Sequence, residues 1–266
     1  MKHTRLLLIF ALALSSAGFA RAQGTVNAME NDFGGRVSVT LEKKLVKGVH
    51  LNAGVEARFN NNFTKFGRYQ AGLGLTWKIN DYFKVGTGYL FIHKQNSEGT
   101  WKPRHRVYLD GTVTFRAGDW RFSLKERLQY TRLNVNNTYQ SNPNSLALKS
   151  RFKVSYKGLK KVTPYAYVEL RNVFNDPSVK ATWNSATQTY SDYSFGGYNH
   201  AYINRIRGSL GAEWKIVKHH YLDFFVLTDY NYNKNIDTNA EGTKLKSLTY
   251  NQGINVNLGV GYKFSF

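Results

Sequence analysis

The sequence contains no cysteine, which excludes disulfide bonds and thiolate metal sites. It has only four prolines in 266 residues, and past the N-terminal segment no run approaches the roughly 18 apolar residues that a membrane helix needs. Acidic residues are also scarce, 17 against 37 Lys and Arg, which gives a formal net charge of +20. The chain is therefore predicted to be neither a disulfide scaffold nor a helical membrane protein, and its basic excess points to anionic surroundings.

The N-terminus has the three parts of an export signal. Lys2 and Arg5 supply positive charge, residues 6–14 are apolar, and residues 20–22 (Ala-Arg-Ala) place small residues around a cleavable bond. The apolar run is too short to span a bilayer as a helix. We expect a cleaved signal peptide at 1–22 and a mature domain at 23–266, starting at Gln23.

The mature chain keeps the basic excess. Without Lys2, Arg5 and Arg21 it has 34 basic and 17 acidic residues, a net charge of +17. A basic excess is often a sign of nucleic-acid binding, but an exported chain rarely meets nucleic acid. Lipid phosphates, including those of lipopolysaccharide, and small anionic solutes are the better expected partners.

From Arg36 to Phe266 apolar and polar residues alternate with the period of a β-strand. The last segment is the clearest, with its apolar face on Ile254, Val256, Leu258, Val260, Tyr262, Phe264 and Phe266. About eleven such segments can be counted, each close to the length of a tilted membrane strand. Aromatic residues make up 15% of the chain, as the interfacial girdles of a membrane barrel require.

The connections between these segments alternate in length. The predicted short turns are 45–48, 80–81, 117–119, 158–161 and 217–219, and the predicted long loops are 60–66, 94–103, 132–144, 172–199 and 233–247. This is the outer-membrane arrangement of short periplasmic turns and long extracellular loops. We predict an all-β, antiparallel transmembrane barrel in the bacterial outer membrane, with about 12 strands, or alternatively 10.

Strand parity is a difficulty, because bacterial barrels have even strand numbers. Residues 24–30 are therefore predicted either to form a short extra strand or to thread through the lumen. Trp77, Trp120 and Trp214 lie beside short turns, as a periplasmic girdle requires. Tyr262, Phe264 and Phe266 form an aromatic ending that is similar to the recognition signal of the barrel-assembly machinery.

Four segments, residues 31–35, 104–110, 127–130 and 163–165, resemble an uncharacterised family of Bacteroidetes-type barrels. The family is catalogued as domain of unknown function twenty-four-ninety. The resemblance covers nearly the whole mature chain. It implies an outer-membrane barrel and supplies no activity or functional residues.

Alternation places an excess of cations on the lumen side of consecutive strands. We single out six as candidate anion-binding residues: Arg104, Arg106, Arg127, Arg151, Arg205 and Arg207. The inward acids on this wall are fewer, namely Asp110, Glu169, Glu213, Asp223 and Asp229. One interpretation is a narrow, porin-like pore or cavity with an anion-attracting wall. The other is a lumen filled with side chains and held together by Arg–carboxylate pairs.

Glu126 interrupts an apolar face between Leu124 and Leu128, which places a carboxylate at the lipid surface. A simple hairpin register puts Ser150 opposite it. His93 and His105 fall on the same outer face, with His105 about four residues along, roughly 13 Å at strand rise. These four residues are candidates for a Ser/His/Glu lipid hydrolase, although the distance is unfavourable and a role without catalysis is favoured.

The sequence gives no cofactor or metal site. The leading functional hypothesis is binding or narrow-pore passage of anionic solutes or lipid phosphates along the basic wall. The alternatives are the lipid hydrolase and a structural or receptor barrel that acts through its extracellular loops. For the last of these, the aromatic-rich residues 172–199 form the candidate partner-binding loop.

Overall fold

The computed structural model describes residues 25–26, 30–96, 99–134 and 142–266. The expected signal peptide at 1–22 lies outside the described residues. No helix in these ranges has the length and apolar character needed to span a membrane.

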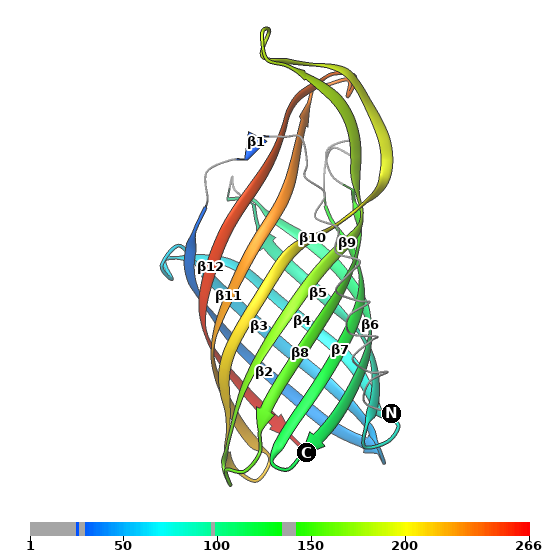
Figure 1. Cartoon of the computed structure of the whole chain (residues 1–266). Helices are drawn as coiled ribbons and strands as arrows, with labels where there is room; N and C mark the ends of the chain where they lie inside the picture. The colour runs from blue at the N-terminus through cyan, green and yellow to red at the C-terminus, as the bar shows by residue number, and fades with distance from the viewer. Residues whose placement is uncertain (1–24, 27–29, 97–98, 135–141) are drawn as a thin grey trace.

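The described chain is a single sheet that curls into a barrel (Figure 1). Its strands are β1 (Thr25–Val26), β2 (Asp32–Val46), β3 (Val49–Asn60), β4 (Lys65–Lys78), β5 (Phe83–Gln95), β6 (Trp101–Ala117), β7 (Trp120–Arg132), β8 (Asn144–Tyr156), β9 (Val162–Asn184), β10 (Thr189–Val217), β11 (His220–Thr238) and β12 (Leu245–Ser265). Each of β2 to β12 pairs antiparallel with its neighbours in sequence. The predicted all-β antiparallel barrel is therefore confirmed.

The barrel closes through a parallel seam between β12 and β2, from Asn255↔Asp32 to Ser265↔Glu42. Within the described ranges the sheet has twelve strands, and eleven of them form the closed wall. The twelfth, β1, is two residues long and lies parallel to β12 at Thr249 and Tyr250, beyond the point where β2 begins to pair. The short extra strand expected within 24–30 is thus present. It does not join the closed wall, which therefore has eleven strands. A wall of alternating strands with an odd number of members can close only through one parallel pair, here β12 and β2.

The outward face of the wall is apolar and exposed. Large aliphatic side chains such as Val37 (51%), Leu73 (59%), Leu109 (62%), Val168 (53%) and Leu210 (68%) keep much of their surface accessible. In water such a band would be unfavourable, whereas hydrocarbon covers it at no cost. Exposed Trp77, Trp120 and Trp214 lie at strand ends beside short turns, where the aromatic girdle was predicted.

Large side chains cover several glycines on the inward face. A Cβ atom on Gly88 would lie 2.4 Å from the Tyr108 hydroxyl, and one on Gly74 would lie 2.7 Å from it. A Cβ atom on Gly259 would lie 2.0 Å from the ring of Phe225. The missing side chains therefore make room for aromatic rings inside the barrel.

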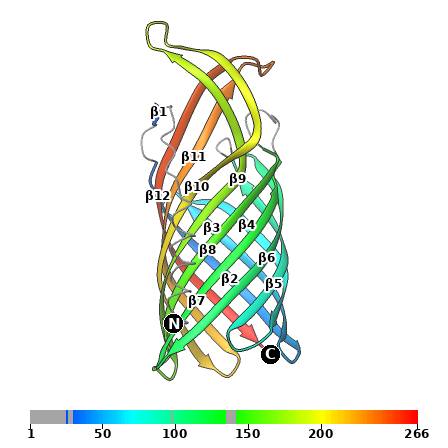
Figure 2. The same ribbon diagram turned by 45° about the vertical axis from the view of Figure 1, so that its right-hand side comes forward.

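At the end of the barrel opposite the C-terminus, the β9–β10 hairpin and the β11–β12 hairpin continue beyond the barrel wall (Figures 1 and 2). The prediction of a loop at 172–199 was wrong, because β9 and β10 run through it and leave a connection of only 185–188. The predicted loop at 233–247 likewise shrinks to 239–244. The β9–β10 register shifts at five places, and each shift breaks the period-two pattern that marks a strand in sequence.

These hairpins share a small apolar core. Ile236, Leu245, Leu248 and Tyr250 are buried there, and partly buried side chains from β9 and β10 pack against them, including Val179 and Tyr190. Some aromatic residues of 172–199, the segment that was predicted to be a loop, therefore help to pack the two hairpins together.

Candidate functional site

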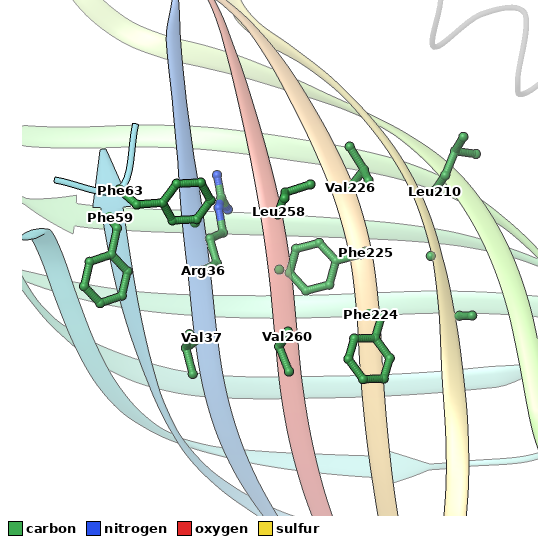
Figure 3. A pocket seen from close by; sticks show the side chains of 14 residues that line it. Arg36, Val37, Phe59, Phe63, Leu210, Phe224, Phe225, Val226, Leu258 and Val260 are labelled. Atoms are coloured by element: carbon green, nitrogen blue, oxygen red, sulfur yellow. The ribbon is translucent and has the colours of Figure 1, made fainter. Parts of the chain in front are cut away.

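The parallel seam carries an apolar pocket, shown in Figure 3. Val37, Leu258, Val260 and Phe224 line it. Its one charged lining residue, Arg36, is already bound to Asp229 at 3.2 Å. The pocket offers no set of polar groups for chemistry, so the candidate site lies among the charged side chains inside the barrel.

Strand register places interior charges in two neighbouring rows. We define the cationic row as Arg127, Lys149, Arg171 and Arg205, which are directly opposite one another on β7, β8, β9 and β10. We define the mixed row as Lys125, Arg151, Glu169, Arg207 and Asp229, which are opposite one another from β7 to β11. The two rows are two residues apart along each shared strand, so they lie on the same face.

The mixed row is held together by ion pairs. Glu169, with a side chain only 2% exposed, accepts hydrogen bonds from Arg151 at 2.5 and 2.9 Å. Asp229 accepts two from Arg207, at 2.5 and 2.8 Å. Asp229 also meets Arg36 of β2 across the seam at 3.2 Å, so this network ties β8 to β11 and β2 together.

The cationic row forms ion pairs only at its two ends, although the charge of Glu169 also acts on Lys149 and Arg171 at its centre. Arg127 forms a bidentate pair with Asp110 at 2.5 and 2.7 Å and lies over the Tyr108 ring, 3.8 Å from its centroid. Arg205 reaches Glu169 of the mixed row at 2.8 Å. For Lys149 and Arg171, in the middle of the row, no carboxylate in the described part of the chain lies within ion-pair distance.

Arg104 and Arg106 approach this row from β6. Arg106 donates to the Thr131 hydroxyl at 2.8 Å and is close enough to Arg127, Arg171 and Arg205 for their charges to act on it. Arg104 acts on Arg171 in the same way. Among the residues that the structure describes, neither guanidinium forms an ion pair.

The six predicted anion-binding arginines therefore divide into two kinds. Arg127, Arg151, Arg205 and Arg207 lie in the two rows and bind carboxylates. Arg104 and Arg106 do not. Lys149 and Arg171 were not among the predicted residues, because the register that aligns them is not visible within one strand.

The outward Glu126 faces Ser150 as predicted from the hairpin register, and the Ser150 hydroxyl donates to the Glu126 carboxylate at 2.6 Å. The position expected for His105 was wrong. Glu126 pairs with Gly111, so His105 lies six residues along β6, about 20 Å at strand rise. The longer separation follows from the true register of β6 and β7.

Both predicted histidines have other partners. The Tyr89 hydroxyl lies 2.6 Å from His105 Nδ1, and the Tyr69 hydroxyl lies 2.7 Å from His93 Nδ1. The four residues proposed for hydrolysis are therefore not brought together into a triad.

The aromatic ending predicted as an assembly signal belongs to β12 and its flank. The Tyr262 hydroxyl lies 2.6 Å from His220 Nδ1, and the rings of Phe264 and Phe266 stack at 5.1 Å. The Phe266 amide donates to the Glu42 carbonyl at 2.9 Å, which fastens the chain end to β2.

A closed wall of mostly antiparallel strands with an apolar outside and a charged inside defines an outer-membrane-type β-barrel. The chain belongs to the family described as "Protein of unknown function (DUF2490)", whose model matches residues 36–240. This confirms the family suggested by the sequence. A search of curated proteins gives no match.

Among solved structures, the chain is similar to the "Outer-membrane expressed OmpT of Vibrio cholerae", with a TM-score of 0.33 and 14% identity. The match covers 81% of this chain and 64% of that one, so the chain spans less than two thirds of the length of that protein.

Proposed function

We propose that this protein is an exported barrel of the bacterial outer membrane whose interior binds small anionic solutes or lipid phosphates and passes them slowly along a basic wall. The observation that carries the proposal is the cationic row, in which four consecutive strands place a cation at the same register position. Lys149 and Arg171, at its centre, have no carboxylate within ion-pair distance among the described residues.

Such a row is unfavourable for folding. Like charges directly opposite one another on a sheet are destabilising. Two like charges about 6 Å apart repel by about 3 kcal/mol at an effective dielectric of about 20. An anion placed between Lys149 and Arg171 would reduce this repulsion, so the row favours binding of negative charge.

The carboxylates of the mixed row do not neutralise the excess positive charge, because they already bind arginines. These two carboxylates, Glu169 and Asp229, are each engaged by more than one arginine. Together with Asp110, which is opposite Arg127 on β6, the two rows hold seven cations and three carboxylates. A filled lumen held by ion pairs accounts for the mixed row, whereas Lys149 and Arg171 form no ion pair among the described residues.

Phosphate binding and conductance together test the proposal. The purified barrel in detergent is titrated with inorganic phosphate, and its reversal potential is measured in planar bilayers under a salt gradient. The double variant Lys149→Gln/Arg171→Gln is expected to lose phosphate binding and most of the anion preference. Lys180→Gln/Lys246→Gln removes two exposed cations of the extended hairpins and serves as the matched control. If the double variant behaves like the parent in both assays, the proposal is wrong.

Export and location have a separate test. Cell fractionation should recover the protein with outer-membrane markers, and N-terminal sequencing of the recovered protein should start at Gln23. Recovery of the processed chain as a water-soluble monomer without detergent would contradict membrane insertion.

A second candidate is a receptor role for the extended β9–β10 and β11–β12 hairpins. Their shared apolar core, built on Ile236, Leu248 and Tyr250, supports it, because a packed extension presents a defined surface to a partner. Replacing residues 177–198 by a short turn should abolish capture of such a partner while the barrel still assembles. Unchanged capture would reject this role.

A further inference from the structure

The short connections of the barrel carry an unusual concentration of positive charge. They comprise residues 47–48, 79–82, 118–119, 157–161 and 218–219. Three of the connections hold an exposed cation, namely Lys47, Lys160 or Lys218. The other two follow strands that have an exposed cation at or near their end, namely Lys78 of β4 and Arg116 of β6. The five turns lie at the same end of the barrel (Figure 1), and we call the cations that they carry the short-turn rim.

Most of this charge is free of local compensation. Lys78 pairs with Asp81 at 2.5 Å, and this hydrogen bond lowers the pKa of the Asp81 carboxyl. In the described ranges, Lys47, Arg116, Lys160 and Lys218 have no carboxylate within ion-pair distance. The rim is thus a charged surface that can meet an external anion.

The opposite end of the barrel differs in sequence. The short connections hold five Lys and two Asp residues. The long connections, 61–64, 96–100, 133–143, 185–188 and 239–244, hold one Lys and two Glu residues although they are longer. The short connections therefore carry an excess of positive charge that the long connections lack, and the exposed lysines at the other end, such as Lys65 and Lys180, lie in strands.

The same turns also expose large apolar side chains. Val46 (62% exposed), Tyr82 (68%), Leu159 (51%) and Val217 (57%) lie in the turns or next to them. They continue the girdle of exposed Trp77, Trp120 and Trp214. Apolar and aromatic groups mixed with lysines fit the boundary between hydrocarbon and head groups better than open water.

We propose that the short-turn rim binds the anionic head groups of phospholipids in the leaflet that surrounds it. The apolar side chains of the turns hold the rim at the level of the glycerol backbone, and the cations extend to the phosphates. Each Lys or Arg near an anionic surface adds to the attraction between the protein and that surface. This binding does not involve the interior rows, so the proposal of lipid binding can be rejected or supported without any change to the proposal of solute binding.

Lipid retention measured by native mass spectrometry tests this proposal. The barrel is extracted from vesicles of phosphatidylglycerol and phosphatidylcholine, and the lipids that remain bound are counted. The test variant is Lys47→Gln/Arg116→Gln/Lys160→Gln/Lys218→Gln. The matched control, from the other end of the molecule, is Lys65→Gln/Lys180→Gln/Lys244→Gln/Lys246→Gln, all exposed in the parent.

The test variant should retain at least about tenfold less phosphatidylglycerol, as loss of four cations predicts. Phosphatidylcholine retention and the control should be unchanged. The charge-preserving variant Lys47→Arg/Lys160→Arg/Lys218→Arg should retain as much phosphatidylglycerol as the parent, which separates an effect of charge from misfolding. Equal retention by parent and test variant overturns the proposal. Loss of binding to isolated peptidoglycan with unchanged lipid retention also overturns it and assigns the rim to the cell-wall polymer.

Discussion

Two neighbouring rows of side chains inside this barrel have nearly the same number of charges but a different order of signs. In the mixed row, Glu169 lies between Arg151 and Arg207, and Asp229 follows Arg207. In the cationic row, Arg127, Lys149, Arg171 and Arg205 follow one another with no carboxylate between them. The comparison separates charges that hold strands together from charges that are open to a ligand.

The largest expected effect comes from removing a carboxylate of the mixed row. Glu169→Gln leaves Arg151 and Arg205 without their buried partner, and breaking a buried pair costs about 3–5 kcal/mol. Urea unfolding in detergent micelles, followed by Trp fluorescence, measures the loss. The control is Glu213→Gln, whose pair with Lys263 is about one third exposed, so it should cost at most about 1 kcal/mol. Equal losses would remove the distinction between the buried network and a peripheral pair.

A second change converts a paired cation into an open one. Asp110→Asn removes the bidentate partner of Arg127, which should destabilise the barrel by about 1–3 kcal/mol. The same variant should bind inorganic phosphate more tightly than the parent, because the free cations of the row then include Arg127. Weaker phosphate binding would indicate that Asp110 shapes the site, in contradiction to the comparison.

Cations at the centre of the cationic row should be dispensable for folding. Lys149→Met or Arg171→Met removes like-charge repulsion and breaks no ion pair, so stability should stay within about 1 kcal/mol of the parent or rise. Arg207→Met should instead lower stability by about 3 kcal/mol, because it takes a bidentate partner from buried Asp229. A large loss in the Lys149 variant would place that residue in the structural network.

A comparably small effect is expected on the outer face of the same strand. Ser150 lies between Lys149 and Arg151 in sequence and points to the opposite side of the sheet. Ser150→Ala removes one hydrogen bond to Glu126 and should cost about 1 kcal/mol. The lipid composition of cells that carry the variant should be unchanged. Accumulation of an intact lipid substrate in those cells would restore the hydrolase hypothesis.

Much of the fold could be predicted from the sequence because alternation is a local property. The outward aliphatic faces, the short turns and the position of the Trp residues all follow from side-chain period and turn length. The pairing of Glu126 with Ser150 was also predicted, from a simple antiparallel register of the two strands that flank the long connection 133–143. The family assignment agrees with these local patterns.

The remaining features depend on contacts between distant strands. The parallel seam of β12 and β2 joins the two ends of the chain, and no local pattern indicates it. The bulges at Ser191–Ser194 and Phe195–Tyr198 interrupt the alternation of the extended hairpin, so a strand was mistaken for a loop. The division of the inward arginines into paired and open groups requires the register of four strands at once, and a list of inward residues cannot supply it.

The most direct test of the account is the sign of the ion selectivity when the centre of the cationic row is reversed in charge. The parent barrel, placed in a planar bilayer under a potassium chloride gradient, should give a reversal potential that indicates preference for chloride. Lys149→Glu/Arg171→Glu should shift that potential toward preference for potassium. If both proteins gave the same reversal potential, or if neither the parent nor the variant conducted ions or bound phosphate, the cationic row would not be a path or a site for anions.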